Sequence, residues 1–339
     1  MCRPMGWRRF ARSLAAAALL GCAATGPAAA ETDLRVVASI KPVHSLVSAV
    51  MAGVGEPYLI IRGASSPHTF TLRPSDAAAL EGADIIFLIG DTMETALAGL
   101  VDALAGHARV VELETALAGP VDGLAGQTLV IALADAPGLV RRLFREGGEF
   151  EVDDAHDHDE EDHGPFDMHL WLDPINGGVM AGVIASILAE ADPANAAAYE
   201  ANAEALLRRL DALTEELTAY LAPARGVPFI VFHDGYRYFE DRFGLTAVGS
   251  VVVSPGRPPG VRRISELRDK VRALGVACVF DEPQFDRRLV QTVIEGSEVR
   301  AGTVDPLGAA IEDGPGLYVT LLRDMAASFR ACLAPGDGG

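Results

Sequence analysis

Histidine is the side chain in this 339-residue sequence best suited to bind a transition metal, and the chain has eight. His68 lies in the loop GASSPHTFTLRPSD, His169 lies in DMHLWLDP, and His233 directly follows the apolar run PFIVF. Asp305 occupies the corresponding place after a later apolar run, in GTVDPLG. Three neutral imidazoles and one carboxylate suit tetrahedral Zn²⁺, whereas Mn²⁺ prefers more oxygen ligands. The sequence therefore predicts a zinc site formed by these four residues.

Each of these residues also has a structural interpretation. A single histidine is more often a hydrogen-bonded structural residue than a ligand, and Asp305 followed by Pro306 is typical of a turn or a cap. We interpret His44 and His107 as structural, because neither occurs in a sequence context of the kind described above. The prediction of a metal site therefore depends on the joint pattern of the four residues.

A second group of histidines lies in an acidic tract, EFEVDDAHDHDEEDH, at residues 149–163. The tract contains His156, His158 and His163 among nine acidic residues. Such a composition cannot form a core, and one interpretation is a solvated acidic loop. The other is an accessory, weak site for a divalent cation. Both interpretations stay open.

The N-terminal residues predict export. Residues 1–30 contain four arginines and no acid, an apolar stretch at 14–24, and the run Ala28-Ala29-Ala30 before Glu31. This pattern is typical of a signal peptide cleaved near Ala30, with an apolar stretch too short to span a membrane. Lipid attachment at Cys22 is the minor alternative. We expect a mature chain without a membrane span.

Export changes the interpretation of the cysteines. Cys2 and Cys22 lie within the predicted signal peptide, so the mature chain keeps Cys278 and Cys332. An even pair in an oxidising compartment predicts a disulfide, and two buried free thiols are the alternative.

Composition excludes one class of partner, and missing motifs make an enzymatic function the weaker interpretation. The chain has 28 lysines and arginines against 47 acidic residues, a formal net charge of −19. A chain this acidic repels a phosphate backbone, so we exclude nucleic acid as a partner. The sequence contains no His-Glu-x-x-His, Gly-x-Ser-x-Gly or P-loop motif. A zinc hydrolase remains an alternative, because three histidines with an open position can also activate water. The missing motifs make it the weaker one.

The elements that must position these residues alternate in an α/β pattern. Strands are predicted at 34–39, 58–61, 84–89 and 109–113, with helices at 43–52, 74–81 and 92–105 between them. A second series has strands at 229–232, 247–253, 276–280 and 299–303. This order is typical of parallel sheets, where ligands collect at the carboxyl ends of the strands. We predict two α/β lobes, each a parallel sheet flanked by helices, with the metal cleft between them.

A long helix is predicted between the two series. Leucines recur at helical spacing from Leu206 to Leu221, and Asp192 followed by Pro193 is typical of a helix start. A helix over 193–221 would be about 43 Å long, and a linker this stiff favours small movements between lobes. We divide the chain into a signal peptide (1–30), an N-terminal lobe (31–191), a linking backbone helix (192–225) and a C-terminal lobe (226–339), and expect a monomer.

Five motifs together resemble the periplasmic zinc-binding subunit of bacterial high-affinity zinc ABC transporters: GASSPHTFTLRPSD, MHLWLDP, VFHDGYRYFE, CVFDEPQF and GTVDPLG. An acidic, histidine-rich loop before MHLWLDP is a further feature of that subfamily. The resemblance implies that His68, His169 and His233 bind Zn²⁺, with Asp305 or water as the fourth ligand. Manganese and iron relatives have Glu where His233 stands, so a manganese or iron binding protein of this fold is the weaker alternative.

The resemblance implies capture and delivery of zinc in the periplasm, not catalysis. A membrane permease recognises the zinc-bound form, and a cytoplasmic ATPase drives import. Cys278 and Cys332 match the pair that zinc members join as a disulfide. This chain has Ser65-Ser66-Pro67 before His68, where some members have an acidic residue next to the histidine.

Overall fold

The computed structural model describes residues 31–97, 99, 109–110, 128–145, 166–252 and 259–334. The predicted signal peptide, His107 and the acidic tract with His156, His158 and His163 lie outside the described residues.

The first lobe contains a five-stranded parallel sheet with the strand order β2-β1-β3-β5-β4. Its strands are β1 (Val36–Ile40), β2 (Tyr58–Ile61), β3 (Ile85–Leu88), β4 (Arg109–Val110) and β5 (Leu129–Ala132). Helices α1 (Lys41–Val50) and α2 (Pro74–Glu81) follow β1 and β2. Every residue of β1 and β3 is buried, as is typical of central strands in a parallel sheet.

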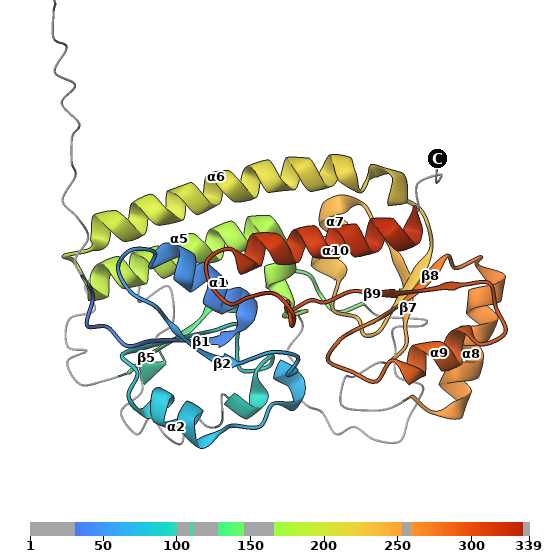
Figure 1. The fold of residues 1–339 in the computed structure, drawn as a ribbon, viewed down its shortest axis with the longest axis horizontal. Helices are drawn as coiled ribbons and strands as arrows, with labels where there is room; N and C mark the ends of the chain where they lie inside the picture. Colours follow the sequence, from blue (N-terminus) through green and yellow to red (C-terminus); the bar gives the residue numbers. More distant parts are fainter. Residues whose placement is uncertain are drawn as a thin grey trace, which may run out of the picture.

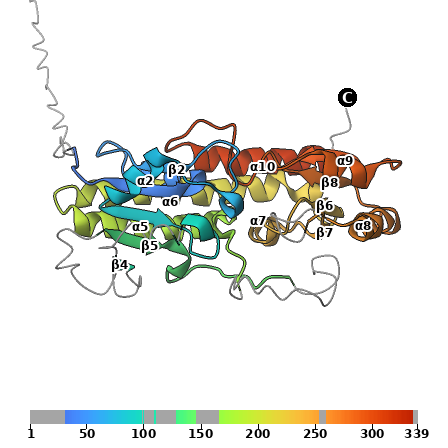
Figure 2. The same cartoon turned by 90° about the horizontal axis from the view of Figure 1, so that it is seen from below.

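The second lobe contains a four-stranded sheet in the order β7-β6-β8-β9, and its paired strands are parallel. Its strands are β6 (Phe229–Val231), β7 (Ala247–Ser250), β8 (Cys278–Asp281) and β9 (Arg300–Thr303). Helices α7 (Arg237–Phe243), α8 (Val261–Ala273) and α9 (Arg288–Ile294) lie between them in sequence. Figures 1 and 2 show the two lobes side by side, which confirms the predicted α/β architecture.

A layer of three helices covers both lobes: α5 (Pro174–Ala191), α6 (Ala196–Tyr220) and α10 (Leu317–Leu333). Helix α6 extends along the whole layer (Figure 1). The predicted helix start at Asp192 and Pro193 is wrong. The backbone N–H of Asp192 instead bonds Leu188 at the end of α5, and its carboxylate accepts hydrogen bonds from Asn195 and Tyr199. The long helix therefore begins at Ala196.

After β9 the chain returns to the first lobe, and α10 then runs from the first lobe to the second (Figure 1). It packs against β9 and also against α1 and α6. The loop before it is held by Lys41, whose Nζ donates to the carbonyl oxygen of Ile311 at 2.7 Å, and by Ser45, whose Oγ donates to the carbonyl oxygen of Gly314 at 2.7 Å. One cluster of buried side chains accordingly includes Val43 of the first lobe and Phe280 of the second.

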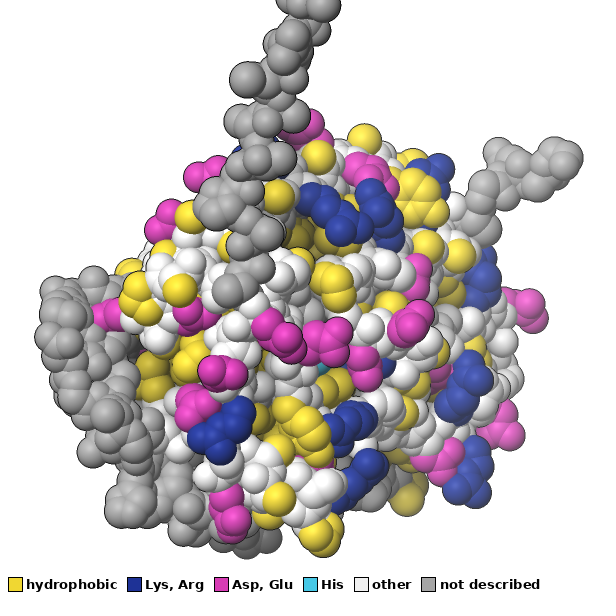
Figure 3. All heavy atoms as spheres, turned by 60° about the vertical axis from the view of Figure 1, so that its left-hand side comes forward, with side chains coloured by type: hydrophobic (Ala, Val, Ile, Leu, Met, Phe, Trp, Pro, Cys, Tyr) yellow, Lys and Arg dark blue, Asp and Glu magenta, His cyan; other side chains and the backbone are white. Residues whose placement is uncertain are grey.

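Within the described residues, one helix, α5, is long and apolar enough to cross a membrane by length and composition. It packs against α6 and α1, and 61% of it is buried inside the molecule. We therefore interpret α5 as a core helix. On the face shown in Figure 3, acidic side chains (magenta) and basic side chains (dark blue) are interspersed.

Glu94 is a carboxyl group buried near the carboxyl ends of β1 and β3, with 1% of its surface exposed. Its Oε1 accepts hydrogen bonds from Ser39 Oγ at 2.5 Å and from the N–H of Ile89 at 3.1 Å. Its Oε2 accepts from the N–H of Gly90 at 3.0 Å. Burial raises the pKa of Glu94 to about 7, although these hydrogen bonds oppose the shift.

We expect Glu94 to make the free energy of unfolding fall as the pH rises. A raised pKa means that the folded state binds more protons, so this stabilisation is complete below the ordinary pKa of 4.5 and is lost as the pH rises through about 7. The shift corresponds to about 3 kcal/mol. Urea unfolding of Glu94→Gln between pH 5 and pH 8 should show a flatter profile than the wild-type protein. Two superimposable profiles would disprove this role.

Candidate metal centre

Three histidine side chains converge between the two lobes. His68 lies in a 3-10 turn (Pro67–Thr69) after β2, His169 directly precedes the turn Leu170–Leu172, and His233 follows β6. One ring nitrogen of each lies within 4.8 Å of the other two. The Nε2 atoms of His169 and His233 are 3.1 Å apart. Bonds of about 2 Å to a tetrahedral zinc ion place two nitrogens roughly 3.3 Å apart, so the three rings fit one ion.

A glycine allows the rings to approach. A Cβ atom at Gly235 would lie 2.5 Å from Nε2 of His233 and 2.9 Å from Nε2 of His169. Both distances are below contact range, so a side chain at position 235 would displace one of the two imidazoles. Sequence reasoning missed this residue, although the pattern His-Asp-Gly after a strand was a signal for it.

Two buried carboxylates orient the imidazoles. Asp167 Oδ1 lies 2.7 Å from Nδ1 of His169, and Glu282 Oε1 lies 2.6 Å from Nδ1 of His233. A carboxylate that accepts from Nδ1 leaves Nε2 as the nitrogen that binds metal, and it also increases the basicity of the ring. Sequence reasoning missed both acids. Their signals were the Asp-x-His spacing in DMH and the Glu after the strand in FDEP.

His233 is fully buried but surrounded by negative charge. Burial lowers the pKa of its imidazole, but the attraction of Glu282 and its hydrogen bond outweigh this effect, and Asp234 adds to them. The net result is a raised pKa. Protons therefore compete with a metal ion for this ring more strongly as the pH falls.

The structure does not bring Asp305 into the group of converging ligand atoms. Its Oδ1 accepts hydrogen bonds from Gln284 Nε2 at 2.9 Å and from the N–H groups of Leu307 and Gly308 at 3.0 Å. Its Oδ2 accepts from the N–H of Ala309 at 2.5 Å. Asp305 thus caps the loop after β9. Three of the four predicted ligands converge, and the fourth has the turn role that its Asp-Pro sequence also favoured.

The cavity at the three rings has a volume of about 10 Å³. Trp171, Gln284 and Phe285 also line it. A volume of roughly 10–15 Å³ holds one water molecule, so the cavity has the size for one ion or one water. A larger groove, of about 320 Å³, lies between α5 and α6, and Asp211 is its one charged lining residue.

His44 lies apart from the group. Its Nε2 is 3.1 Å from the carbonyl oxygen of Pro57, and burial lowers the pKa of its imidazole. This environment agrees with the structural role that we predicted for it.

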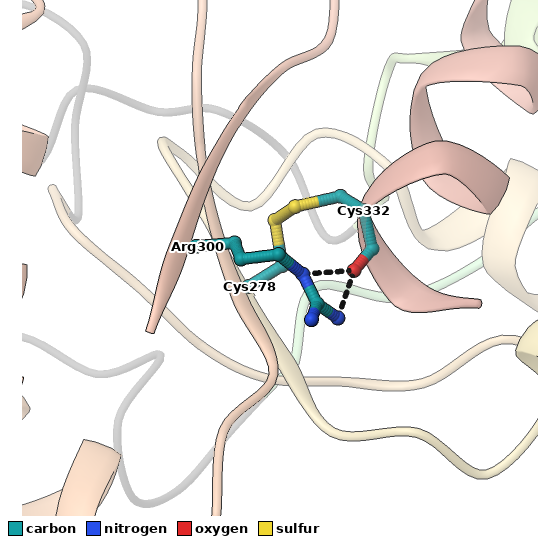
Figure 4. The surroundings of a disulfide bond; sticks show 3 residues. All are labelled: Cys278, Arg300 and Cys332. Carbon is teal, nitrogen blue, oxygen red and sulfur yellow. Dashed lines mark hydrogen bonds between the residues drawn. A yellow bond between two sulfur atoms is a disulfide. The ribbon is translucent and has the colours of Figure 1, made fainter. Parts of the chain in front are cut away.

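A disulfide joins Cys278 on β8 to Cys332 near the end of α10, with the two Cα atoms 6.0 Å apart. Arg300 on β9 donates two hydrogen bonds to the carbonyl oxygen of Cys332, at 3.0 and 2.6 Å (Figure 4). The predicted disulfide is present, and it fixes the end of α10 to the second sheet.

Two parallel-sheet lobes that meet at three converging histidines define a metal-binding protein of the two-lobed solute-binding class. The chain belongs to the family described as zinc-uptake complex component A periplasmic, which matches residues 36–332.

Individual relatives agree with this assignment. The chain is 46% identical over 328 residues to the high-affinity zinc uptake system protein ZnuA of Brucella suis biovar 1, covering 88% of this chain and 91% of that protein. A crystal structure of ZnuA has a similar fold, with a TM-score of 0.69 at 24% identity, covering 89% of this chain and 99% of that one. A ZnuA deletion mutant with zinc bound gives a TM-score of 0.68 at 24% identity, covering 88% and 98%.

Proposed function

We propose that this protein captures Zn²⁺ in the periplasm with high affinity and delivers it to a zinc ABC permease. The observation that carries this proposal is the convergence of three imidazole nitrogens within 4.8 Å of one another. Membership in the zinc-uptake family and the zinc-uptake relatives support the same function.

In this proposal, His68, His169 and His233 bind the ion through one ring nitrogen each, and a water molecule completes a tetrahedral site. Water is favoured over Asp305 because both oxygens of that carboxylate already accept hydrogen bonds. Within the described residues, no carboxylate oxygen joins the three close nitrogens. Such a nitrogen-rich set suits Zn²⁺ better than Mn²⁺, so the manganese or iron alternative is weaker.

We propose binding without catalysis. A zinc hydrolase needs space for a substrate beside the metal-bound water. The cavity of about 10 Å³ at the histidines is far smaller than a substrate molecule would need beside the ion and its water. The size of the site therefore supports capture of a bare ion over hydrolysis.

The remaining proposals concern delivery. We propose export through a signal peptide cleaved near Ala30, with lipid attachment at Cys22 as the alternative, and action as a monomer on a permease driven by a cytoplasmic ATPase. The boundaries at 31–191, 192–225 and 226–339 remain our division of the mature chain, with the amendment that the long helix begins at Ala196. The layer of α5, α6 and α10 shared by both lobes supports small interlobe movements.

Deletion of the acidic tract tests whether the three converging histidines form the tight zinc site. We propose that His156, His158 and His163 form an accessory, weak site. A variant lacking residues 149–163 should keep the tight zinc affinity of the full chain within about twofold, since the three converging histidines lie outside the deletion. Calorimetric competition against a chelator measures this affinity.

A variant with asparagine at positions 156, 158 and 163 is the matched control, because it removes the imidazoles and keeps the length of the tract. Both variants should lose the weak binding and keep the tight binding. Loss of tight binding in either variant would show that the principal zinc site lies in the tract. A full chain without tight zinc binding would refute the proposed function.

A further inference from the structure

Helix α7 follows His233 and faces the segment of the first lobe that carries His169. Tyr238, at the second position of α7, has 1% of its surface exposed. Its hydroxyl donates a hydrogen bond to the carbonyl oxygen of Asp167 at 2.6 Å and accepts one from the N–H of Arg142 at 3.0 Å. The N–H of Asp167 bonds in turn to the carbonyl oxygen of Arg142 at 2.9 Å. One hydroxyl thus joins both chain segments to α7.

Two charged side chains of α7 also bind residues that precede or follow Asp167 in the sequence. Arg242 makes two hydrogen bonds to the carboxylate of Asp173, at 2.8 and 2.7 Å. Glu240 accepts two from the guanidinium of Arg145, at 2.8 and 2.9 Å. These ion pairs attach the same helix to residues on either side of Asp167 in the sequence, so Tyr238 is one of three side chains of α7 that hold this segment.

The contact continues to the metal centre on both sides. Asp167 Oδ1 bonds both the backbone N–H of His169, at 3.0 Å, and its Nδ1, at 2.7 Å. A shift of the Asp167 backbone therefore moves the His169 ring. On the other side, the chain runs from His233 through Gly235 directly into α7. The Tyr238 hydroxyl thus connects the backbone that holds one ligand to the helix that follows the other.

We propose that Tyr238 is a positioning residue that sets the separation of His169 and His233 and thereby the zinc affinity. The proposal rests on the zinc function proposed above. Ligands held at the binding distance before the ion arrives lose less freedom on binding. Burial raises the pKa of Tyr238 to about 12, so its hydroxyl keeps the proton that it donates to Asp167 near neutral pH.

Removal of this one hydroxyl tests the proposal. Tyr238→Phe in the full chain should raise the zinc dissociation constant about tenfold, mainly through faster dissociation, which corresponds to the loss of roughly one hydrogen bond. Tyr199→Phe is the matched control. Tyr199 is also fully buried, and its hydroxyl donates to Asp192 Oδ2 at 3.0 Å, at the start of the helical layer. The control should keep the wild-type dissociation constant within about twofold.

A spectroscopic measurement separates positioning from general destabilisation. Co²⁺ bound in place of Zn²⁺ has visible absorption bands that respond to ligand geometry, and these bands should shift in Tyr238→Phe and not in Tyr199→Phe. If Tyr238→Phe does not fold, Arg242→Gln tests the same contact from its more exposed edge and should cause a smaller change in the same direction.

The outcomes distinguish the two proposals. Wild-type affinity and wild-type Co²⁺ bands in Tyr238→Phe, or in Arg242→Gln if it replaces that variant, would overturn the role of Tyr238 and leave the zinc function intact. Equal losses in Tyr238→Phe and Tyr199→Phe would also overturn it. A wild-type protein that binds no zinc would overturn the proposed function itself.

Discussion

Replacement of His233 with alanine should weaken zinc binding by about a thousandfold or more, roughly 4 kcal/mol. Its Nε2 is one of three nitrogens that converge on the site, and no other ligand atom of the described residues joins the group to replace it. The loss should therefore exceed the ten- to hundredfold effect that is typical of residues that only orient a ligand. Competition with a fluorescent zinc chelator at neutral pH measures it directly.

His44→Gln is the matched control for this experiment. His44 is also buried and has a hydrogen-bond partner, the carbonyl oxygen of Pro57, but it lies outside the converging group. Its replacement should leave zinc affinity within about threefold of the wild-type value. Equal losses in the two variants would show that the effect comes from general destabilisation, and would contradict the ligand role of His233.

Removal of the disulfide should lower the free energy of unfolding by about 4 kcal/mol. Cys278 and Cys332 are 54 residues apart, and the chain-entropy model attributes this stabilisation to the restriction of the unfolded chain. Both cysteines are buried, so we choose alanine, which leaves no polar side-chain atom in the core. Guanidinium unfolding of the double variant Cys278→Ala, Cys332→Ala measures the loss.

A reducing agent supplies the control for the disulfide. It should lower the stability of the wild-type protein towards that of the double variant and leave the double variant unchanged. Equal stabilities of the wild-type protein and the double variant in the absence of reducing agent would show that the cross-link contributes nothing. A double variant that is sensitive to the reducing agent would indicate a second redox-active group in the chain.

The parts of the fold that follow from local pattern could be predicted. Buried parallel strands form continuous apolar runs, so β1 and β3 were recognisable from composition, and the leucine spacing identified the long helix. The start of that helix could not be predicted, because Asp192-Pro193 has the residue types of a helix start although the helix begins later. In the fold, Asp192 instead bonds Asn195 and Tyr199 and terminates α5.

Some residues of the candidate site could be predicted from the sequence, and others could not. Histidines at strand ends and in loops could be singled out because the carboxyl ends of parallel strands collect ligands. The roles of Glu282 and Gly235 depend on distances between segments far apart in sequence, and sequence reasoning missed both. Asp305 shows that a residue in the position of a ligand can have a different role in the fold. Its position matched that of a ligand, but the neighbouring N–H groups of its own loop occupy its oxygens.

The contact between the start of α10 and the first lobe has a consequence for biogenesis. The N-terminal sheet is synthesised early, yet α1 packs against a helix formed by the last described residues, and Ser45 bonds the loop that precedes it. The nascent chain therefore lacks part of the interior of its first lobe until α10 has been synthesised. A chain that cannot complete its packing before α10 is made exposes apolar surface for longer, and such surface is open to proteases and to aggregation.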